Sequence, residues 1–289
     1  MKLSLLIKLI RPHHYIKNMF IFLPLFFAMK ITELSLFLDG IVAFIAFSIT
    51  ASAIYILNDY LDIEEDRKHF KKKYRPLAAG TISKKQAIII MTVMGILGMF
   101  IMMTLSLKAG GILFLYILLN VAYSFKLKHI AILDVIIISI GFVLRLFVGS
   151  EVTDISLSVW IVTMTFLLAL FLALAKRRDD MLIYLDTGKK MRKVIDGYSL
   201  QFLDIAMSIM ASVVIMSYIN YTSSSAVVER IDNEYLYLTS LFVIMGIMRY
   251  LQITFVLKES GSPTRIVLVD KFIQLTLIGW IATFSWILY

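Results

Sequence analysis

The sequence predicts an all-α integral membrane protein with nine transmembrane helices. Of its 289 residues, 60% are hydrophobic, and the mean hydropathy of +0.86 exceeds that expected of a soluble protein of this length. The apolar residues form runs that are long enough to cross a bilayer as helices. Lys and Arg gather in alternate breaks between these runs, which is typical of loops on the cytoplasmic side of a membrane.

The chain begins with a short interfacial segment, which the spans follow. Residues 1–14 combine leucine and isoleucine with basic residues and predict an amphipathic segment on the membrane surface. From apolar length and the breaks between runs, we expect spans at 16–35, 38–58, 86–107, 109–127, 131–150, 156–176, 200–222, 235–257 and 270–288. Pro24 interrupts the first span. No soluble domain or long linker is evident, so we expect residues 1–289 to form a single integral-membrane domain.

The distribution of basic residues predicts the orientation in the cell membrane. The N-terminal segment and the loops after the second, fourth, sixth and eighth spans carry most of the 29 Lys and Arg residues. The opposite side has only Lys30, Lys108 and Arg230. We therefore expect the N-terminus in the cytoplasm and the C-terminus outside. Basic cytoplasmic loops explain the net charge of +9 without nucleic acid as a partner, and the absence of cysteine excludes disulfides and thiolate metal sites.

Acidic residues gather where the second span reaches the cytoplasm. If the helix continues, Asn58, Asp62 and Asp66 fall four residues apart and share one face, with Asp59 beside it. Crowded carboxylates repel each other, and a divalent cation that is also bound by a phosphate relieves this repulsion. We therefore expect Asn58, Asp62 and Asp66 to hold Mg²⁺. The alternative is a solvated acidic helix end, which is costly at a membrane boundary.

Basic residues follow this acidic motif closely. Arg67, Lys72, Lys73 and Arg75 lie within ten residues of Asp66. Metal-bound carboxylates beside Arg and Lys can bind a polyphosphate and stabilise it as a leaving group. The alternative for these basic residues is contact with lipid headgroups, which also sets the topology.

Two other cytoplasmic span ends combine side chains suited to a site. Tyr123 and Lys126 lie three residues apart, and Lys176 shares a helix face with Asp179 and with Asp180. Tyr123 and Lys126 can face one pocket, or they can sit in the membrane interface. The residues around Lys176 can bind a phosphate or a metal, or they can form a solvated helix end.

Two arginines, Arg145 and Arg249, lie inside predicted spans. A charge at such depth is costly and needs an anionic partner, so both arginines are candidate site residues. The alternative for Arg145, which lies near the outer end of its span, is that its side chain extends to the outer membrane surface.

The motifs resemble those of the UbiA superfamily of intramembrane prenyltransferases. The resemblance rests first on Asn58-Asp59-x-x-Asp62-x-x-x-Asp66 within nine spans. Longer motifs resemble its decaprenyl-phosphate phosphoribosyltransferase branch: Arg11-Pro-x-x-x-x-Lys17-Asn18, Asp66-Arg67-x-His69-x-x-Lys72-Lys73-x-Arg75-Pro76-x-Ala78-Ala79-Gly80, Tyr123-Ser124-x-x-Leu127-Lys128, Lys176-Arg177 and Gly261-Ser262-Pro263-Thr264. Tyr15 and Phe70 depart from the family, which often has Trp and Pro at these positions.

The resemblance implies a nine-helix bundle with a cytoplasmic cap and a magnesium-dependent reaction. This branch transfers 5-phosphoribosyl from phosphoribosyl pyrophosphate to a polyprenyl phosphate and releases pyrophosphate. Asp62, Asp66, Lys72 and Arg75 would be catalytic, and Asn58 would join the two aspartates in binding the metal. Substrates would contact Lys17, Asn18, Arg67, Lys73, Tyr123, Lys126, Lys128, Lys176 and Arg177.

Two other functions remain open on the sequence. The first is a prenyltransferase of the same superfamily that moves an isoprenoid from its diphosphate to an aromatic or other small acceptor. Its aromatic members carry a second motif with aspartates four apart, whereas Asp179 and Asp180 are adjacent here. The second is a transporter or lipid-binding bundle, which would need more polar residues in mid-span than this chain has.

Overall fold

The structure is a computed structural model that describes residues 3–68, 72–188, 190, 192–258 and 263–288. Every regular element in these ranges is a helix. The predicted motif residues His69, Gly261 and Ser262 lie outside the described ranges. The chain divides into two compact units, residues 1–157 and residues 158–289, which we call unit 1 and unit 2.

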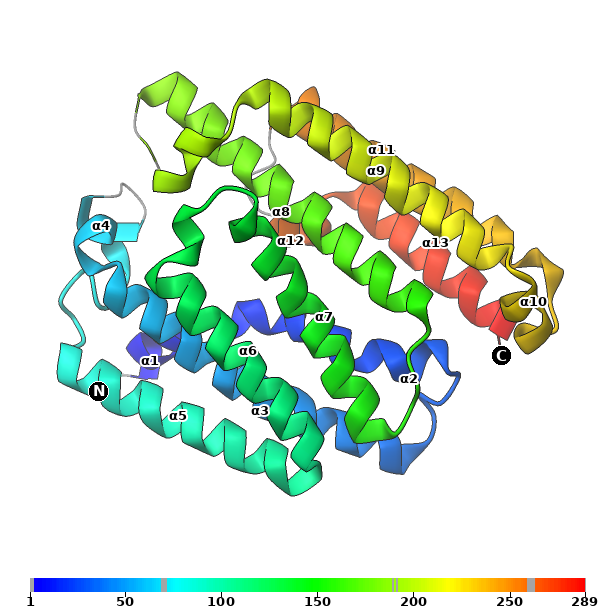
Figure 1. The fold of residues 1–289 in the computed structure, drawn as a ribbon, viewed down its shortest axis with the longest axis horizontal. Helices are drawn as coiled ribbons and strands as arrows, with labels where there is room; N and C mark the ends of the chain where they lie inside the picture. Colours follow the sequence, from blue (N-terminus) through cyan, green and yellow to red (C-terminus); the bar gives the residue numbers. More distant parts are fainter. Residues whose placement is uncertain (1–2, 69–71, 189, 191, 259–262, 289) are drawn as a thin grey trace. The chain divides into compact units, whose positions relative to one another are not determined.

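Unit 1 is built around one long helix, α3 (Figure 1). Its elements are α1 (Leu3–Ile10), η1 (Pro12–Phe22), α2 (Leu23–Phe27), α3 (Leu34–Leu61), α4 (Ile63–Lys68), η2 (Lys72–Tyr74), α5 (Lys84–Leu105), α6 (Leu107–Phe125), η3 (Leu127–His129) and α7 (Leu133–Thr153), where η denotes a 3₁₀-helix. Helix α3 packs against α1, η1, α5, α6 and α7. The fully buried side chains of unit 1 include Phe47, Met102, Leu113 and Leu146. The core of unit 1 therefore lies around α3.

Unit 2 consists of longer helices joined by short ones (Figure 1). Its elements are α8 (Val159–Thr187), η4 (Lys193–Gly197), α9 (Leu200–Thr222), α10 (Ser225–Ile231), η5 (Glu234–Thr239), α11 (Ser240–Phe255), α12 (Pro263–Val269) and α13 (Lys271–Leu288). Helix α9 packs against α8 and α11, and α11 packs against α13. Helix α8 ends at Thr187, where Gly188 adopts a left-handed conformation with φ of 65°. Lys176 to Asp180 therefore lie inside a helix rather than at its end.

Serine residues start four of the long helices. The side chain of Ser83 accepts a hydrogen bond from the backbone of Gln86, whose side chain bonds back to Ser83 in a capping box. The side-chain oxygen atoms of Ser106, Ser158 and Ser199 each accept one backbone hydrogen bond at the starts of α6, α8 and α9. These caps fix where apolar runs become helices, because they satisfy backbone N–H groups that have no partner within the helix.

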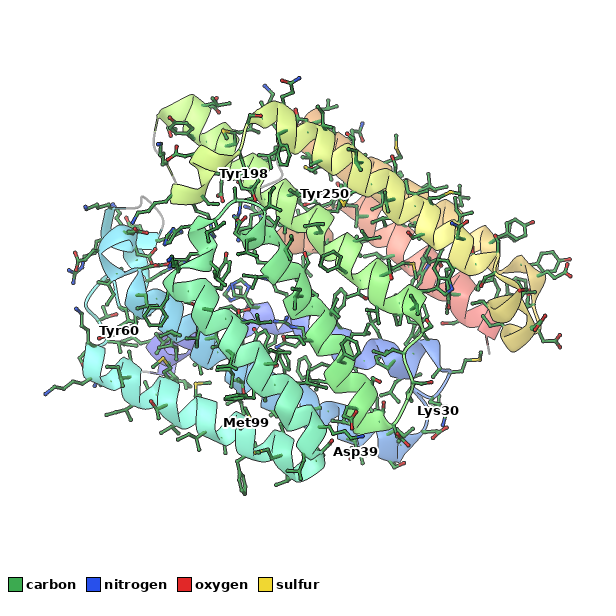
Figure 2. All side chains as sticks on the ribbon, in the orientation of Figure 1. Lys30, Asp39, Tyr60, Met99, Tyr198 and Tyr250 are labelled. Carbon is green, nitrogen blue, oxygen red and sulfur yellow. The ribbon has the colours of Figure 1, made fainter. Side chains whose placement is uncertain are left out.

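Seven of the described helices are long and apolar enough to cross a membrane. They correspond to the second through eighth predicted spans, and the eighth consists of η5 and α11 together (Glu234–Phe255). The ninth predicted span contains α13, which is a shorter apolar helix. The chain is therefore a multi-pass membrane protein. In Figure 2, Lys30 and Asp39 lie at one end of unit 1, and Tyr60 lies at the other end, where the acidic motif begins.

The first predicted span differs from the expected α-helix. Residues 12–22 form a 3₁₀-helix, and the α-helix that follows has only five residues. Pro12 and Pro24 stand at the starts of these two elements, where the missing N–H group costs no helical hydrogen bond. Packing also shapes this segment, because η1 contacts both α3 and α7.

Gly149 is required for the contact between η1 and α7. A Cβ atom at Gly149 would lie 2.0 Å from the carbonyl oxygen of Ile21, which is backbone and cannot move aside independently. We expect Gly149→Ala to destabilise the protein by about 1–3 kcal/mol through this overlap. Gly111→Ala is the control, because nothing lies within 4 Å of its added Cβ. Thermal unfolding in detergent measures both, and an unchanged midpoint for Gly149→Ala would contradict the contact.

Candidate active site at the end of helix α3

The acidic motif lies at a break between two helices. Helix α3 ends at Leu61 and α4 starts at Ile63, with Asp62 between them at φ −97° and ψ 10°. The backbone N–H of Asp62 still donates to Asn58 (3.0 Å), and that of Asp66 donates to Asp62 (2.8 Å). The chain therefore keeps helical hydrogen bonds on both sides of the break, which holds all the acidic side chains of the motif close to the end of the span.

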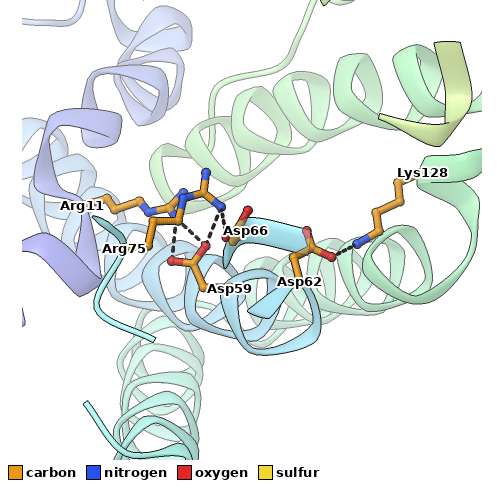
Figure 3. Close-up of polar contacts among 6 residues, drawn as sticks. All are labelled: Arg11, Asp59, Asp62, Asp66, Arg75 and Lys128. Atoms are coloured by element: carbon orange, nitrogen blue, oxygen red, sulfur yellow. Dashed lines mark hydrogen bonds and ion pairs between the residues drawn. The ribbon is translucent and has the colours of Figure 1, made fainter. Parts of the chain in front are cut away.

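Asp59 and Asp66 converge on a single nitrogen atom (Figure 3). Nη1 of Arg75 donates to a carboxylate oxygen of Asp59 at 3.0 Å and to one of Asp66 at 2.7 Å. Arg11 donates to both oxygens of Asp59. Asp59 and Asp66 are each only 2% exposed. Two buried carboxylates and two guanidinium groups thus form one charged cluster.

Asp62 pairs with a different cation. Nζ of Lys128 lies 2.5 Å from a carboxylate oxygen of Asp62. The side chains of Lys128 and Asp62 are 11% and 28% exposed, so this ion pair is largely shielded from solvent. The sequence predicts that Asp62 and Asp66 share one face with Asn58, whereas the structure pairs Asp66 with Asp59 through Arg75 and directs Asp62 to Lys128 (Figure 3).

Burial affects the protonation of Asp66. Burial of its carboxyl group raises the pKa of Asp66, and the neighbouring charge of Asp59 adds to this increase. The positive charges of Arg75 and Lys72 act in the opposite direction. The anionic form of Asp66 therefore depends on nearby cations, which is the environment in which a bound metal ion would be favourable.

The residues at the end of α3 fit a magnesium ion that is shared with a substrate. Within the described ranges, no group of three or more Asp, Glu or His side chains is arranged to enclose a metal. Mg²⁺ does not need such a group, because proteins commonly bind it through one or two carboxylates and leave its other positions to phosphate oxygens and water. Asp59 and Asp66, which converge on one positive atom, have the oxygen ligands and the geometry for this mode of binding.

The predicted phosphate-binding residues divide into two groups. Arg75 contacts the carboxylates of Asp59 and Asp66, and the positive charges of Arg75 and Lys72 both act on Asp66. Arg67 instead donates to the carbonyl oxygen of Ala78 (3.2 Å) and to Glu64 (2.8 Å). Lys73 is exposed, with its ammonium group 5.1 Å from the ring centroid of Tyr74.

The N-terminal segment attaches to one polar face of α3. Ser48, Ser52, Tyr55 and Asp59 recur along α3 at helical spacing. Asn18 donates to Ser48 (2.9 Å), Tyr15 and Ser52 share a hydrogen bond (2.9 Å), and Arg11 lies 5.8 Å from the ring centroid of Tyr55 before it reaches Asp59. The recurrence of polar residues at i, i+4, i+7 and i+11 in an apolar helix is the sequence signal that indicates this contact.

Asn18, a predicted substrate-binding residue, is buried in a network with Arg145. Its side-chain oxygen accepts a hydrogen bond from Nε of Arg145 at 2.8 Å. Arg145 also donates to the carbonyl oxygen of Gly141 (2.6 Å) and to the hydroxyl of Tyr116 (3.2 Å). The rings of Phe47, Tyr116 and Phe142 surround its guanidinium at 4.9–5.2 Å. Among the described residues, Arg145 therefore has neutral hydrogen-bond partners and aromatic rings instead of the anionic partner that we expected.

The remaining predicted residues of unit 1 lie near the end of α6 or in η1. Tyr123 is half-buried in the last turn of α6, and Lys126 is exposed directly after it. Lys17 is half-buried in η1, where the positive charges of Arg11 and Arg145 act on it.

In unit 2, the basic residues of α8 are paired. Arg177 is 1% exposed and donates to Asp180 at 2.9 Å, and Arg192 lies 3.1 Å from the same carboxylate. Arg178 donates to Asp204 (2.6 Å) and to the carbonyl oxygen of Thr254 (2.7 Å). Lys176 is half-buried in the same helix.

Arg249 has the anionic partner that its depth in a span predicts. It lies 2.8 Å from Asp270, whose carboxylate also accepts a hydrogen bond from the backbone of Ile273 at the start of α13. This ion pair joins α11 to α13.

The fold and the site together define a class of protein. It is a multi-pass, all-α membrane protein with a buried carboxylate cluster and basic side chains at the end of one membrane helix. The chain belongs to the UbiA prenyltransferase family, whose family model matches residues 19–286.

Curated relatives and solved structures agree with this membership. The chain is 29% identical to the decaprenyl-phosphate phosphoribosyltransferase of Mycolicibacterium smegmatis, over 98% of this chain and 92% of the relative. It is also 29% identical to the enzyme of the same name from Corynebacterium glutamicum, over 96% of this chain and 84% of the relative. A UbiA homologue from Archaeoglobus fulgidus, solved with GPP and Mg²⁺, has the same fold: the TM-score is 0.70, each chain is 98% covered, and the identity is 17%.

Proposed function

We propose that this protein transfers 5-phosphoribosyl from phosphoribosyl pyrophosphate to a polyprenyl phosphate and releases pyrophosphate. The observation that carries this proposal is that each carboxylate of the acidic motif is already paired with a cation, in Asp59–Arg11, Asp66–Arg75 and Asp62–Lys128. Carboxylates are the side chains that bind Mg²⁺, and Arg and Lys are those that bind phosphate. The site thus contains both kinds of side chain that a magnesium-bound diphosphate requires. The full-length similarity to named phosphoribosyltransferases supports this choice of donor and acceptor.

The residues of the site take distinct roles in this proposal. Asn58, Asp62 and Asp66, together with Asp59, which meets Asp66 at Arg75, would hold Mg²⁺, which would neutralise negative charge on the departing pyrophosphate. Lys72 and Arg75 bind the same leaving group, and Arg67 and Lys73 extend the basic surface along the loop. The acceptor phosphate is already anionic and needs no strong general base. Its oxygen forms the bond to the sugar carbon as the bond to pyrophosphate breaks.

Other predicted residues complete the substrate contacts. Lys17, Tyr123, Lys126 and Lys128 lie in unit 1, and Lys176 and Arg177 lie in unit 2. In our proposal the residues of unit 1 bind the lipid phosphate and the ribose 5-phosphate, and Lys176 and Arg177 remain predicted phosphate-binding residues of unit 2. Asn18 acts through its buried bonds to Ser48 and Arg145, which fix the position of the segment that carries Lys17.

We further propose nine membrane crossings within one domain. At about 2.0 Å per residue in a 3₁₀-helix and about 1.5 Å in an α-helix, η1 and α2 together extend about 30 Å, which equals the hydrocarbon thickness of a bilayer. Helix α13 extends about 27 Å by the same measure. The family match runs through both units, which supports a single domain. We also propose that the N-terminus, the site and its cap lie in the cytoplasm and the C-terminus outside, which the distribution of basic loops supports.

The experiment is a label-transfer assay on the purified protein in detergent with Mg²⁺. Labelled phosphoribosyl pyrophosphate and a short polyprenyl phosphate form one arm. A labelled prenyl diphosphate and an aromatic acid form the second, because the structural relative from Archaeoglobus fulgidus binds a prenyl diphosphate. We expect label to enter the lipid phase only in the first arm, and to stop doing so when EDTA removes the metal. Transfer only in the second arm would overturn the proposal in favour of a prenyltransferase, and transfer in neither would also overturn it.

A further inference from the structure

An apolar groove lies between α3, α5 and α6 of unit 1. Its volume is about 330 Å³, which is at the lower end of the range for ligand-binding pockets. Helix α3 contributes Thr50, Ala53 and Leu57, α5 contributes Gly95, and α6 contributes Ile117 and Phe125. These positions recur at helical spacing, so the groove runs along the helices for about 10–12 Å.

The lining of the groove is suited to hydrocarbon. Thr50 is its only polar side chain among the described residues, and its hydroxyl already donates to the carbonyl oxygen of Ala46 at 3.0 Å. A polar ligand would lose hydrogen bonds to water without gaining any from this lining. A hydrocarbon chain loses none and gains contacts along the whole groove.

One end of the groove reaches the charged site. Leu57 directly precedes Asn58, where the acidic motif begins, and Phe125 directly precedes Lys126. Lys128, which follows shortly after, lies 2.5 Å from Asp62. Two lysines, Lys126 and Lys128, therefore follow the lining residue Phe125 along the chain at this end of the groove. This combination is complementary to an anionic headgroup that carries one apolar chain.

We propose that this groove binds the polyprenyl chain of the lipid acceptor next to its phosphate, with the phosphate at Lys126 and Lys128. This inference rests on the proposed function, because it assigns a subsite to the acceptor of that reaction. A polyprenyl phosphate carries one chain attached directly to its phosphate, as a single groove that ends at lysines requires. A phospholipid carries two chains on a glycerol, of which the groove accommodates one.

Gly95 provides a direct test of this subsite. The nearest atom to a Cβ added at Gly95 is Cβ of Ala53, at 3.9 Å, which is ordinary van der Waals contact. Gly95→Ala should therefore fold, whereas the larger side chain of Gly95→Leu occupies the groove. Gly111→Leu on α6 is the matched control, because a Cβ at Gly111 meets nothing within 4 Å and Gly111 does not line the groove.

The kinetic experiment compares these three variants with the wild type in the transfer assay. We expect Gly95→Leu to raise the KM for the polyprenyl phosphate about tenfold, through loss of apolar contact, and to leave the KM for phosphoribosyl pyrophosphate unchanged. Gly95→Ala should raise the acceptor KM less than Gly95→Leu does, because its side chain is smaller, and Gly111→Leu should keep both constants. Equal effects of Gly95→Leu and Gly111→Leu, or an unchanged acceptor KM in Gly95→Leu, would overturn the assignment of the groove.

A binding experiment tests the groove even if no phosphoribosyl transfer occurs. A polyprenyl phosphate with a photoreactive group in its first isoprene units is added to the wild-type protein in detergent, and the cross-linked peptides are identified. We expect cross-links to 50–57, 91–95 or 117–125 that excess unlabelled polyprenyl phosphate removes and excess phosphatidylglycerol does not. Cross-links confined to other segments, or equal displacement by phosphatidylglycerol, would overturn the proposal. Cross-links in the groove without transfer would reject the proposed reaction alone.

Discussion

Asp66→Asn should lower the rate of phosphoribosyl transfer by about 100-fold or more while the protein stays folded. Asp66, like Asp59, is buried and in direct contact with Arg75, and its burial leaves its negative charge dependent on neighbouring cations. The amide keeps the shape and accepts a hydrogen bond from Arg75. It removes the charge that would bind Mg²⁺, so the variant should need a higher magnesium concentration to reach half of its maximal rate.

Glu64→Gln is the control for this prediction. Glu64 also lies in α4, and its substitution removes one negative charge in the same way. Its side chain is 72% exposed and pairs with Arg67 rather than with the buried cluster. Activity of Glu64→Gln should stay within about twofold of the wild type, since exposed ion pairs contribute little. A folded Asp66→Asn protein with wild-type turnover and magnesium dependence would remove Asp66 from the metal site.

Arg75→Met should destabilise unit 1 strongly as well as abolish transfer. Arg75 is the partner shared by Asp59 and Asp66, and its loss leaves Asp66 buried without that ion pair. Breaking a buried pair by removing one partner commonly costs about 3–5 kcal/mol. Because the Arg75 side chain is 28% exposed, solvent screens part of this interaction, and we expect about 2–3 kcal/mol. The measurement is the thermal unfolding midpoint in detergent at constant ionic strength.

A double variant separates this charge effect from lost packing. Arg75→Met combined with Asp66→Asn should recover part of the lost stability, because no unpaired charge then remains at Asp66. Lys108→Met is the exposed comparison: the Lys108 side chain is 83% exposed and lies 3.7 Å from Glu151, so its midpoint should hardly change. If the double variant were as unstable as Arg75→Met alone, the stability of the cluster would not come from the Asp66–Arg75 pair.

The sequence predicts well those features of the fold that depend on local sequence. The seven long helices follow from apolar runs, and serine caps fix several of their starts. The first span was predicted as an ordinary helix, although residues 12–22 are a 3₁₀-helix. Pro24 marked that segment as irregular, but the close approach of η1 to Gly149 depends on residues far along the chain and is not visible in the local pattern.

The partners of the two arginines inside spans show the same difference between local and long-range determinants. Arg249 lies only 21 residues from Asp270, and its depth predicted an anionic partner correctly. The same argument was wrong for Arg145 among the described residues, because three aromatic rings and neutral oxygen atoms from distant segments surround it. Burial predicts that a charge needs compensation, and only the packed structure decides which groups supply it.

The sequence by itself determined the membrane class, the main spans, and the position of a carboxylate motif next to basic residues. These features follow from composition and from spacing along a single helix, which are local properties. The tertiary structure decided which cation each carboxylate meets. Arg11 reaches Asp59 across 48 residues of sequence, and Lys128 reaches Asp62 across 66. It also created the apolar groove, because a groove exists only where side chains from three separate helices leave space between them.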